Sequence, residues 1–224
     1  MMERDVIFDV IGDVAVPWCG ADMDSGDLAR VAEFVAGRNL PMVSVGVASV
    51  GTLWPWLENT NVRIISRFYL DGRKVDVDDI SDLTVQINAS FKQGASGAQV
   101  FLRAAALDDL VRQTHMVRDD LFFNKELTIG LDVCDIAVDM WGDVFAGLKK
   151  INASSVLFAL TRDAGDKSDF VGRIYGMLNN WDDEFRGTLQ FAFGPNFMRI
   201  EQATRLVESI RPELSENMKI WVNV

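Results

Sequence analysis

The sequence predicts a closed (β/α)8 barrel of the TIM type, formed by one domain over residues 1–224. Three observations support this fold class. The chain contains eight short apolar runs, a stretch with helical periodicity separates each run from the next, and eight such repeats fit a length of 224 residues. This alternation requires parallel strands joined by helical crossovers. An open doubly wound α/β sheet has the same alternation and is the alternative.

The eight expected strands are rich in β-branched and aromatic residues, with few polar interruptions. Strands that are covered on both faces have this composition, because neither side of the sheet meets water. The expected strands are Val6–Val14, Met42–Ser49, Val62–Phe68, Ala98–Leu102, Leu127–Leu131, Val156–Leu160, Thr188–Phe193 and Lys219–Val224.

The first helix is expected from Ser25 to Val35, because Asp24 supplies an N-cap and Gly37 a stop. The next connection, 51–58, is short and places tryptophans on both sides of a proline, which favours packing or a subunit contact over a ligand platform. The remaining helices each carry one apolar stripe. They are expected at 79–94, Leu107–Leu121, Val138–Leu148, Phe170–Trp181 and Phe197–Ile210.

The predicted barrel lacks the helix after its last strand, because the sequence stops at Val224. The outer face of that strand would then expose apolar surface, which soluble monomers rarely keep. We therefore expect a partner subunit or an N-terminal segment to cover it, and we expect a homo-oligomer.

Composition excludes several classes of partner. A net charge of -11 and a pI near 4.5 argue against binding nucleic acid, which needs clustered Lys and Arg. No apolar run approaches the roughly 20 residues of a membrane span, and residues 1–5 lack the features of a signal peptide. We expect a cytoplasmic protein without a membrane partner. Cys19 and Cys134 have neither disulfide-scaffold nor zinc spacing.

Three arginines follow apolar runs on three different expected strands: Arg67, Arg103 and Arg162. Because the active sites of such barrels lie at the C-terminal ends of the strands, these side chains could converge on a carboxylate or phosphate. In the alternative interpretation they only neutralise neighbouring aspartates, with Arg162–Asp163 and Arg103–Asp132 as the obvious pairs. Both interpretations stay open.

Asp132 and Asp163 are the candidate catalytic carboxylates. Asp132 ends the fifth strand, where it could act as a general base or, with Asp135 and Asp163, hold Mg²⁺. The other interpretation of Asp132 is a plain helix cap, a role that suits Asp135 better than a chemical one. On the first strand Asp13, rather than Asp9, would lie near the mouth. No cofactor other than a possible Mg²⁺ is indicated.

The sequence lacks the histidines and the strand-end lysine that several catalytic mechanisms require. The single histidine, His115, falls inside an expected helix, so neither a Ser-His-Asp triad nor a multi-histidine site is available. No lysine ends a strand, which argues against Schiff-base chemistry and leaves Lys167 in the sixth loop as the fallback. In the seventh loop, Asn196 precedes a helix whose free N–H groups could bind an anion.

The order of the segments and the sequence Gly94–Val100 that leads into the fourth strand resemble barrels of the aldolase and ribulose-phosphate-binding type. No family motif matches residue by residue, so the resemblance assigns no catalytic residue. We expect a lyase or isomerase acting on a small anionic, possibly phosphorylated metabolite, bound by the three arginines and Asn196. The alternative is a non-catalytic barrel that serves as a binding or assembly module.

Overall fold

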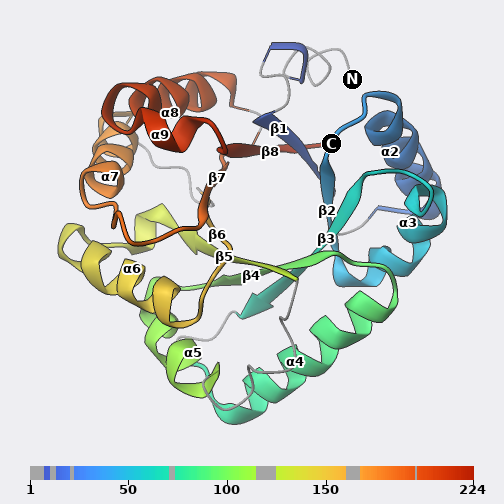
Figure 1. Ribbon diagram of the computed structural model, residues 1–224, viewed down its shortest axis with the longest axis horizontal. Coiled ribbons are helices and arrows are strands. Elements are labelled where there is room, and N and C mark those ends of the chain that lie inside the picture. The colour runs from blue at the N-terminus through green and yellow to red at the C-terminus, as the bar shows by residue number, and fades with distance from the viewer. Residues whose placement is uncertain are drawn as a thin grey trace.

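Eight parallel strands pair in the order of the sequence and close into a barrel, with helices around the outside, in the computed structural model of the protein (Figure 1). The closed barrel confirms the predicted fold class and excludes the open doubly wound sheet. The structure describes residues 8–10, 14–20, 23–70, 74–114, 125–159, 167–194 and 196–224.

The strands agree with the expected positions from the second onward. They are β1 (Ala15–Trp18), β2 (Met42–Gly46), β3 (Arg63–Leu70), β4 (Gly97–Leu102), β5 (Glu126–Asp132), β6 (Ser155–Ala159), β7 (Thr188–Ala192) and β8 (Lys219–Asn223). The ladders differ in length. β1 pairs with β8 through four residue pairs but with β2 through Trp18↔Ser44 alone, and β7 pairs with β8 through two.

Helices connect successive strands. They are α2 (Ser25–Gly37), α3 (Val50–Leu57), α4 (Val77–Lys92), α5 (Leu107–Thr114), α6 (Trp141–Lys150), α7 (Lys167–Asn179), α8 (Phe197–Ile210) and α9 (Pro212–Ser215). As predicted, the Asp24 side chain caps α2 by accepting from the N–H of Asp27 at 2.8 Å. Short 3-10 turns stand before α3, α5 and α6, and one at Val133–Asp135 directly follows β5.

The prediction of a first strand at Val6–Val14 is wrong. Residues 8–10 are helical, and the strand is Ala15–Trp18, which contains Pro17. The N–H of Cys19 points to β2, where it donates to Ser44, so by alternation the missing N–H of Pro17 faces β2 as well. β1 makes its shortest ladder on that side. Pro17 is therefore tolerated in β1, because its missing N–H faces the side on which β1 has almost no ladder.

The shift of the first strand also moves its acidic residues. Asp9 is exposed and forms an ion pair at 2.6 Å with Arg38, the residue that follows α2, away from the barrel interior. Phe8 is buried against Phe34, with 5.0 Å between the ring centroids. Asp13 lies outside the described residues.

The last strand is covered within the described chain, so of the two expected covers, a partner subunit or an N-terminal segment, the partner is not required. Ile220 and Val222 of β8 are fully buried within the single chain, in the same hydrophobic cluster as Phe8 of the N-terminal segment and with Leu214 of α9 packed against it. No second subunit is needed to cover this strand, and a homo-oligomer stays a prediction.

Side chains fill the inside of the barrel. The apolar inner cluster consists of Val16, Met42, Ile65, Phe101, Leu157, Ala159, Ala192 and Trp221, with Trp18 packed against it. A larger cluster lies between the strands and the helices. On the outside, Trp54 packs where a Cβ on Gly94 would be, so this tryptophan has the predicted packing role.

Candidate functional site at the C-terminal mouth of the barrel

Strand β3 brings two arginines to the inside of the barrel. Ile65 belongs to the inner cluster, and side chains alternate along a strand, so Arg63, Arg67 and Tyr69 share its inward side. Arg63 begins the strand and therefore lies at the N-terminal end of the barrel. Arg67 and Tyr69 lie towards the C-terminal mouth, where barrels of this kind carry their active sites.

Arg67 is buried, with 4% of its surface exposed. Its guanidinium reaches past β2 to the end of β1. There Nη2 donates to the carbonyl of Cys19, and the guanidinium carbon lies 4.9 Å from the ring centroid of Trp18. Burial lowers the pKa of Arg67, an effect that Tyr69 and Cys19 oppose. Burial also raises the pKa of the Cys19 thiol to about 12, although the nearby Arg67 favours the thiolate. The thiol is therefore neutral at physiological pH.

Buried hydrogen-bond donors without an acceptor gather beside Arg67. Among the described residues, the buried side-chain nitrogen and oxygen atoms that lack a partner are Nε and Nη1 of Arg67 and Nε2 of Gln99. The two residues face each other in the register of β3 and β4. The Ser44 hydroxyl donates to Oε1 of Gln99 at 2.7 Å, which leaves the amide NH2 as the unmatched group. All three unmatched atoms are donors, so they would match the oxygens of an anion.

A series of aromatic rings leads from Arg67 to the surface. The ring centroid of Trp18 lies 5.5 Å from that of Phe101, which in turn stacks on Tyr69 at 5.2 Å. Phe101 lies over Gly130 of β5, where a Cβ would overlap its ring. Tyr69 is 57% exposed. The β4–β5 side of the interior is thus filled, and the outermost ring faces solvent.

There is open space on the β2 side of the mouth. Gly46 ends β2, faces inward by alternation with Met42, and is the register partner of Arg67. A Cβ built on Gly46 would meet no heavy atom within 4 Å. The inward position beside Arg67 in the register is therefore not filled by a side chain from β2.

Asp132 ends β5 at the same mouth. It is half-buried, and its Oδ1 accepts from the N–H of Cys134 at 2.8 Å, so it caps the turn that follows the strand. Arg173 of α7 holds this turn, because its Nη1 donates to the carbonyls of Val133 at 3.0 Å and Cys134 at 3.2 Å. The carboxylate is thus fixed in place, and the cap role is the one that the contacts display.

The other predicted site residues are less central. Arg103 is exposed, and no ion pair joins it to Asp132. Asn196 is exposed and caps α8 by accepting from the N–H of Arg199 at 3.1 Å. Arg162 and Asp163 lie outside the described residues. In the part of the chain that is described, no group of three or more His, Cys, Asp and Glu side chains could hold a metal ion.

Sequence reasoning missed Gln99, Trp18 and Gly46. Gln99 could have been found, because it is a polar residue inside an otherwise apolar strand. Trp18 was hidden by the wrong position of the first strand. Gly46 carries no signal of its own, since its importance comes from the register that pairs it with Arg67.

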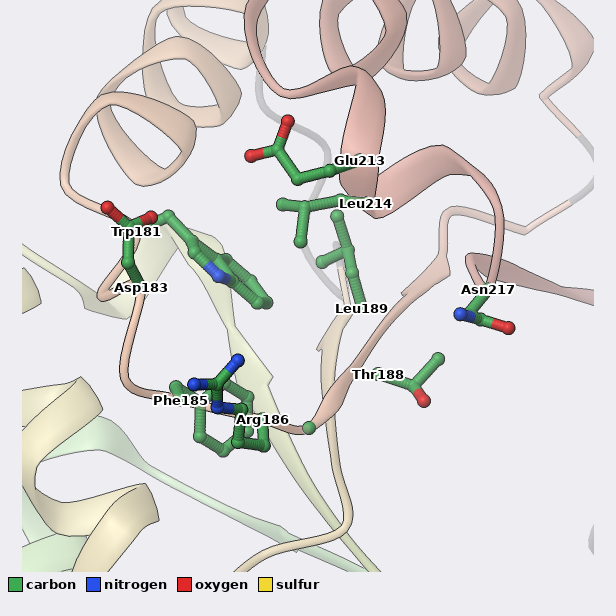
Figure 2. Close-up of a pocket in the computed structure, with 10 residues that line it drawn as sticks. Trp181, Asp183, Phe185, Arg186, Thr188, Leu189, Glu213, Leu214 and Asn217 are labelled. Atoms are coloured by element: carbon green, nitrogen blue, oxygen red, sulfur yellow. The ribbon is translucent and has the colours of Figure 1, made fainter.

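A pocket of about 250 Å³ lies at the opposite, N-terminal end of the barrel (Figure 2). Its lining includes the loop before β7, with Trp181 and Phe185, and the segment before β8, with Leu214. Asp183 and Glu213 at its edge both contact Arg211, at 2.7 and 3.5 Å. In this fold that end of the barrel usually serves stability.

The fold and the site define a (β/α)8 barrel with a donor-rich mouth, and solved structures share this fold. The deoxyribose phosphate aldolase from Aeropyrum pernix matches with a TM-score of 0.71 and 9% identity, over 95% of this chain and 86% of that one. QR15, an aldolase, matches with a TM-score of 0.65 and 7% identity, over 94% and 89% of the two chains.

A third match is the carboxyl transferase domain of Rhizobium etli pyruvate carboxylase, solved with pyruvate and biocytin. It has a TM-score of 0.61 and 11% identity, over 98% of this chain and 43% of that one. No family model matches the sequence, and no curated protein matches it. At these identities the likeness shows the fold. Among the described helices, none has the length and apolarity needed to cross a membrane.

Proposed function

We propose that the protein is an enzyme of the lyase or isomerase type that binds a small anionic metabolite at the C-terminal mouth, with Arg67 as the anchor of the anion. One observation carries this proposal: Arg67 and its register partner Gln99 present buried donors that no described protein group accepts. A buried donor without an acceptor costs about 1 to 3 kcal/mol, and more when the group is charged. An anion would remove this cost.

The contacts of Arg67 do not fit the alternative interpretation, in which the arginines only neutralise neighbouring aspartates. A filled mouth in which every arginine neutralises an aspartate would give Arg67 a carboxylate partner. Its described partners are the Cys19 carbonyl and the Trp18 ring, both without net charge at neutral pH. The positive charge of Arg67 thus stays available to a ligand.

The lyase or isomerase class is supported by the chemistry of the mouth and by two neighbours whose names identify them as aldolases. A guanidinium beside a bound anion would stabilise negative charge that develops during proton abstraction. Asp132 would accept the proton as general base. Among the described strand residues the only lysine is Lys219, at the N-terminal end, so the proposal uses proton transfer rather than a strand lysine.

The remaining predicted residues take supporting roles in this proposal. Asp163 is the second candidate for proton transfer, and Arg103, Arg162 and Asn196 would extend the anion site around the mouth. A phosphorylated sugar is one form of the substrate, in line with the name of the Aeropyrum pernix enzyme. Mg²⁺ held by Asp132 and Asp163 stays a proposal of the same kind.

A thermal-unfolding screen tests the anion site. The wild-type protein would be heated with inorganic phosphate, deoxyribose 5-phosphate, acetate and pyruvate. An anion at 100 times its Kd adds about 2.7 kcal/mol to the free energy of unfolding. We expect Arg67→Met to weaken its binding about tenfold to hundredfold, because charge-assisted hydrogen bonds contribute about 1.5 to 3 kcal/mol. The matched control is Arg63→Met, on the same face of the same strand.

A second experiment separates an enzyme from a binding module. An anion that stabilises the protein would be incubated in D2O, and the loss of its carbon-bound protons would be followed by NMR. Asp132→Asn is expected to bind the anion and to abolish the exchange, because asparagine still caps the turn but cannot take the proton. Binding without exchange in the wild type would favour the non-catalytic barrel. The cap contacts of Asp132 and Asn196 are the observations that support this alternative.

A further inference from the structure

The anion site carries a single buried positive charge among the described residues. Arg67 is 4% exposed, whereas Arg103 at the same mouth faces solvent. One guanidinium balances one negative charge, and an uncompensated charge in a buried site is costly. A carboxylate monoanion therefore matches the buried end of the site better than a phosphate dianion does.

The donors fit a carboxylate in number as well as in charge. Nε and Nη1 of Arg67 and Nε2 of Gln99 offer hydrogen atoms from two adjacent strands. A carboxylate has two oxygens with about four acceptor positions, so it can satisfy all three atoms at once. The Ser44 hydroxyl fixes the Gln99 amide from the other side at 2.7 Å.

Aromatic rings stand beyond these donors, towards the solvent end of the mouth. Tyr69 stands two residues beyond Arg67 on the same face of β3, a rise of about 6.6 Å. That rise matches the distance from a carboxylate to the far side of an attached six-membered ring. Phe101 covers one face of Tyr69, and the tyrosine is 57% exposed, so its other side is open to a ligand.

We propose that the ligand is a planar carboxylic acid, aromatic or conjugated, whose carboxylate binds Arg67 and Gln99 and whose plane lies against Tyr69 over Gly46. This inference rests on the proposed anion site and names the class of ligand that it binds. The substrate would be a conjugated member of this class that carries the proton Asp132 takes, and an aromatic member would bind without reacting. Planar groups stack favourably on aromatic rings beyond the gain from burial alone, and a flexible or saturated body lacks this contribution. The space at Gly46 admits the ligand, because a Cβ there would meet nothing within 4 Å.

Equilibrium binding by calorimetry tests the proposal with four probes. Benzoate carries the plane and one charge, cyclohexanecarboxylate keeps the charge without the plane, phenyl phosphate keeps the plane with about two charges, and benzamide keeps the plane without charge. We expect benzoate to bind at least fivefold more tightly than each of the other three.

Two variants assign the preference to the site. Tyr69→Leu is expected to bring benzoate to the affinity of cyclohexanecarboxylate, while the latter changes less than twofold. The matched control is Tyr175→Leu, which replaces the other tyrosine of the chain, an exposed residue on α7, and is expected to leave all affinities unchanged. Gly46→Val is expected to weaken both carboxylates.

The failures of the two proposals can be told apart. If no anion binds the wild type, the anion site itself is refuted. If anions bind and Arg67→Met abolishes the binding, but phenyl phosphate or cyclohexanecarboxylate binds as tightly as benzoate, only the planar carboxylate is refuted. A benzoate preference that survives in Tyr69→Leu also overturns it.

Discussion

The two ends of the barrel treat the same residue type in opposite ways. Arg63 and Arg67 lie four residues apart on the inward face of β3. At the N-terminal end Arg63 pairs with Glu126 at 2.7 Å, and Glu126 also accepts from the Ser155 hydroxyl at 3.4 Å. At the C-terminal end Arg67 is more deeply buried and contacts no described carboxylate. One strand thus carries a charge that is satisfied within the protein and one whose donors stay unmatched.

The rim of the N-terminal end also pairs its charges. At the N-terminal end Lys149 contacts Asp182 and Glu184, and Arg211 contacts Asp183 and Glu213. Charges at that end are used to hold loops together. Among the described residues, the N-terminal end thus pairs its charges within the protein, whereas Arg67 at the C-terminal end keeps unmatched donors for the site that we propose.

The largest expected effect contrasts two glycines with positive φ, one at each end. Gly94, at the N-terminal end, has φ 111° and lies against Trp54, while Gly194, at the mouth, has φ 66° and no heavy atom within 4 Å of a built Cβ. Gly94→Ala adds steric overlap to backbone strain and should lower the free energy of unfolding by about 2 to 5 kcal/mol. Gly194→Ala adds strain alone, about 1 to 2 kcal/mol. Urea denaturation measures both, and equal losses would contradict the contrast.

The next effect concerns stability at Arg67. Removing one partner of an ion pair usually destabilises, but Arg67→Met removes a buried charge that no carboxylate balances. Without added ligand, the free energy of unfolding of Arg67→Met should be equal to that of the wild type or higher, by up to about 2 kcal/mol. Urea denaturation at pH 7 gives the answer. A loss above about 2 kcal/mol would mean that the bond to the Cys19 carbonyl and the contact with Trp18 outweigh the cost of burying the charge.

An effect confined to high pH is expected through Cys19, and at neutral pH it is absent. Its pKa is raised from 9.0 to about 12, so the folded state holds the thiol proton more tightly than the unfolded state does. The stability from this group is therefore complete below pH 9 and is lost between about pH 9 and pH 12. The free energy of unfolding should fall less steeply over this range in Cys19→Ala than in the wild type. An unchanged slope would show that the thiol is more accessible than its burial implies.

The smallest effect is expected at the exposed ion pairs of the N-terminal end. The hydrogen bond from Lys149 lowers the pKa of Asp182, so the stability from this carboxylate is present above its ordinary pKa of 3.8 and is lost as the pH falls below that value. In Lys149→Met the Asp182 carboxyl should titrate at higher pH, as measured by NMR. Solvent screens such pairs, so the melting temperature at pH 7 should hardly change.

The sequence sufficed for the barrel because its signals are local. Apolar runs and helix caps located β2 to β8 within a few residues, and Arg67 was identified because it follows the apolar run of the third strand. The position of β1 was lost because Val6–Val14 is longer and richer in β-branched residues than the short, proline-containing strand Ala15–Trp18. The missing N–H of a proline argues against a strand only when the neighbouring strand has a carbonyl that needs this donor. The sequence does not show which side of the strand the proline N faces.

The site was less predictable because it depends on register. Gln99 and Gly46 matter through their pairing with Arg67 across β4 and β2, which only the closed sheet defines. Asp132 was placed correctly at a strand end, and it makes the cap contact of the alternative interpretation.

The unequal ladders also determine where the barrel would open. β8 and β1 hold each other through four residue pairs but join their other neighbours through two and one. The first and last strands thus behave as one unit, inserted between β7 and β2. Local unfolding would begin at the two borders of this unit, so amide hydrogens there should exchange before those of β3 to β6. The hydrogen bond from Arg67 to the Cys19 carbonyl spans the weaker border, so Arg67 also ties this unit to β3.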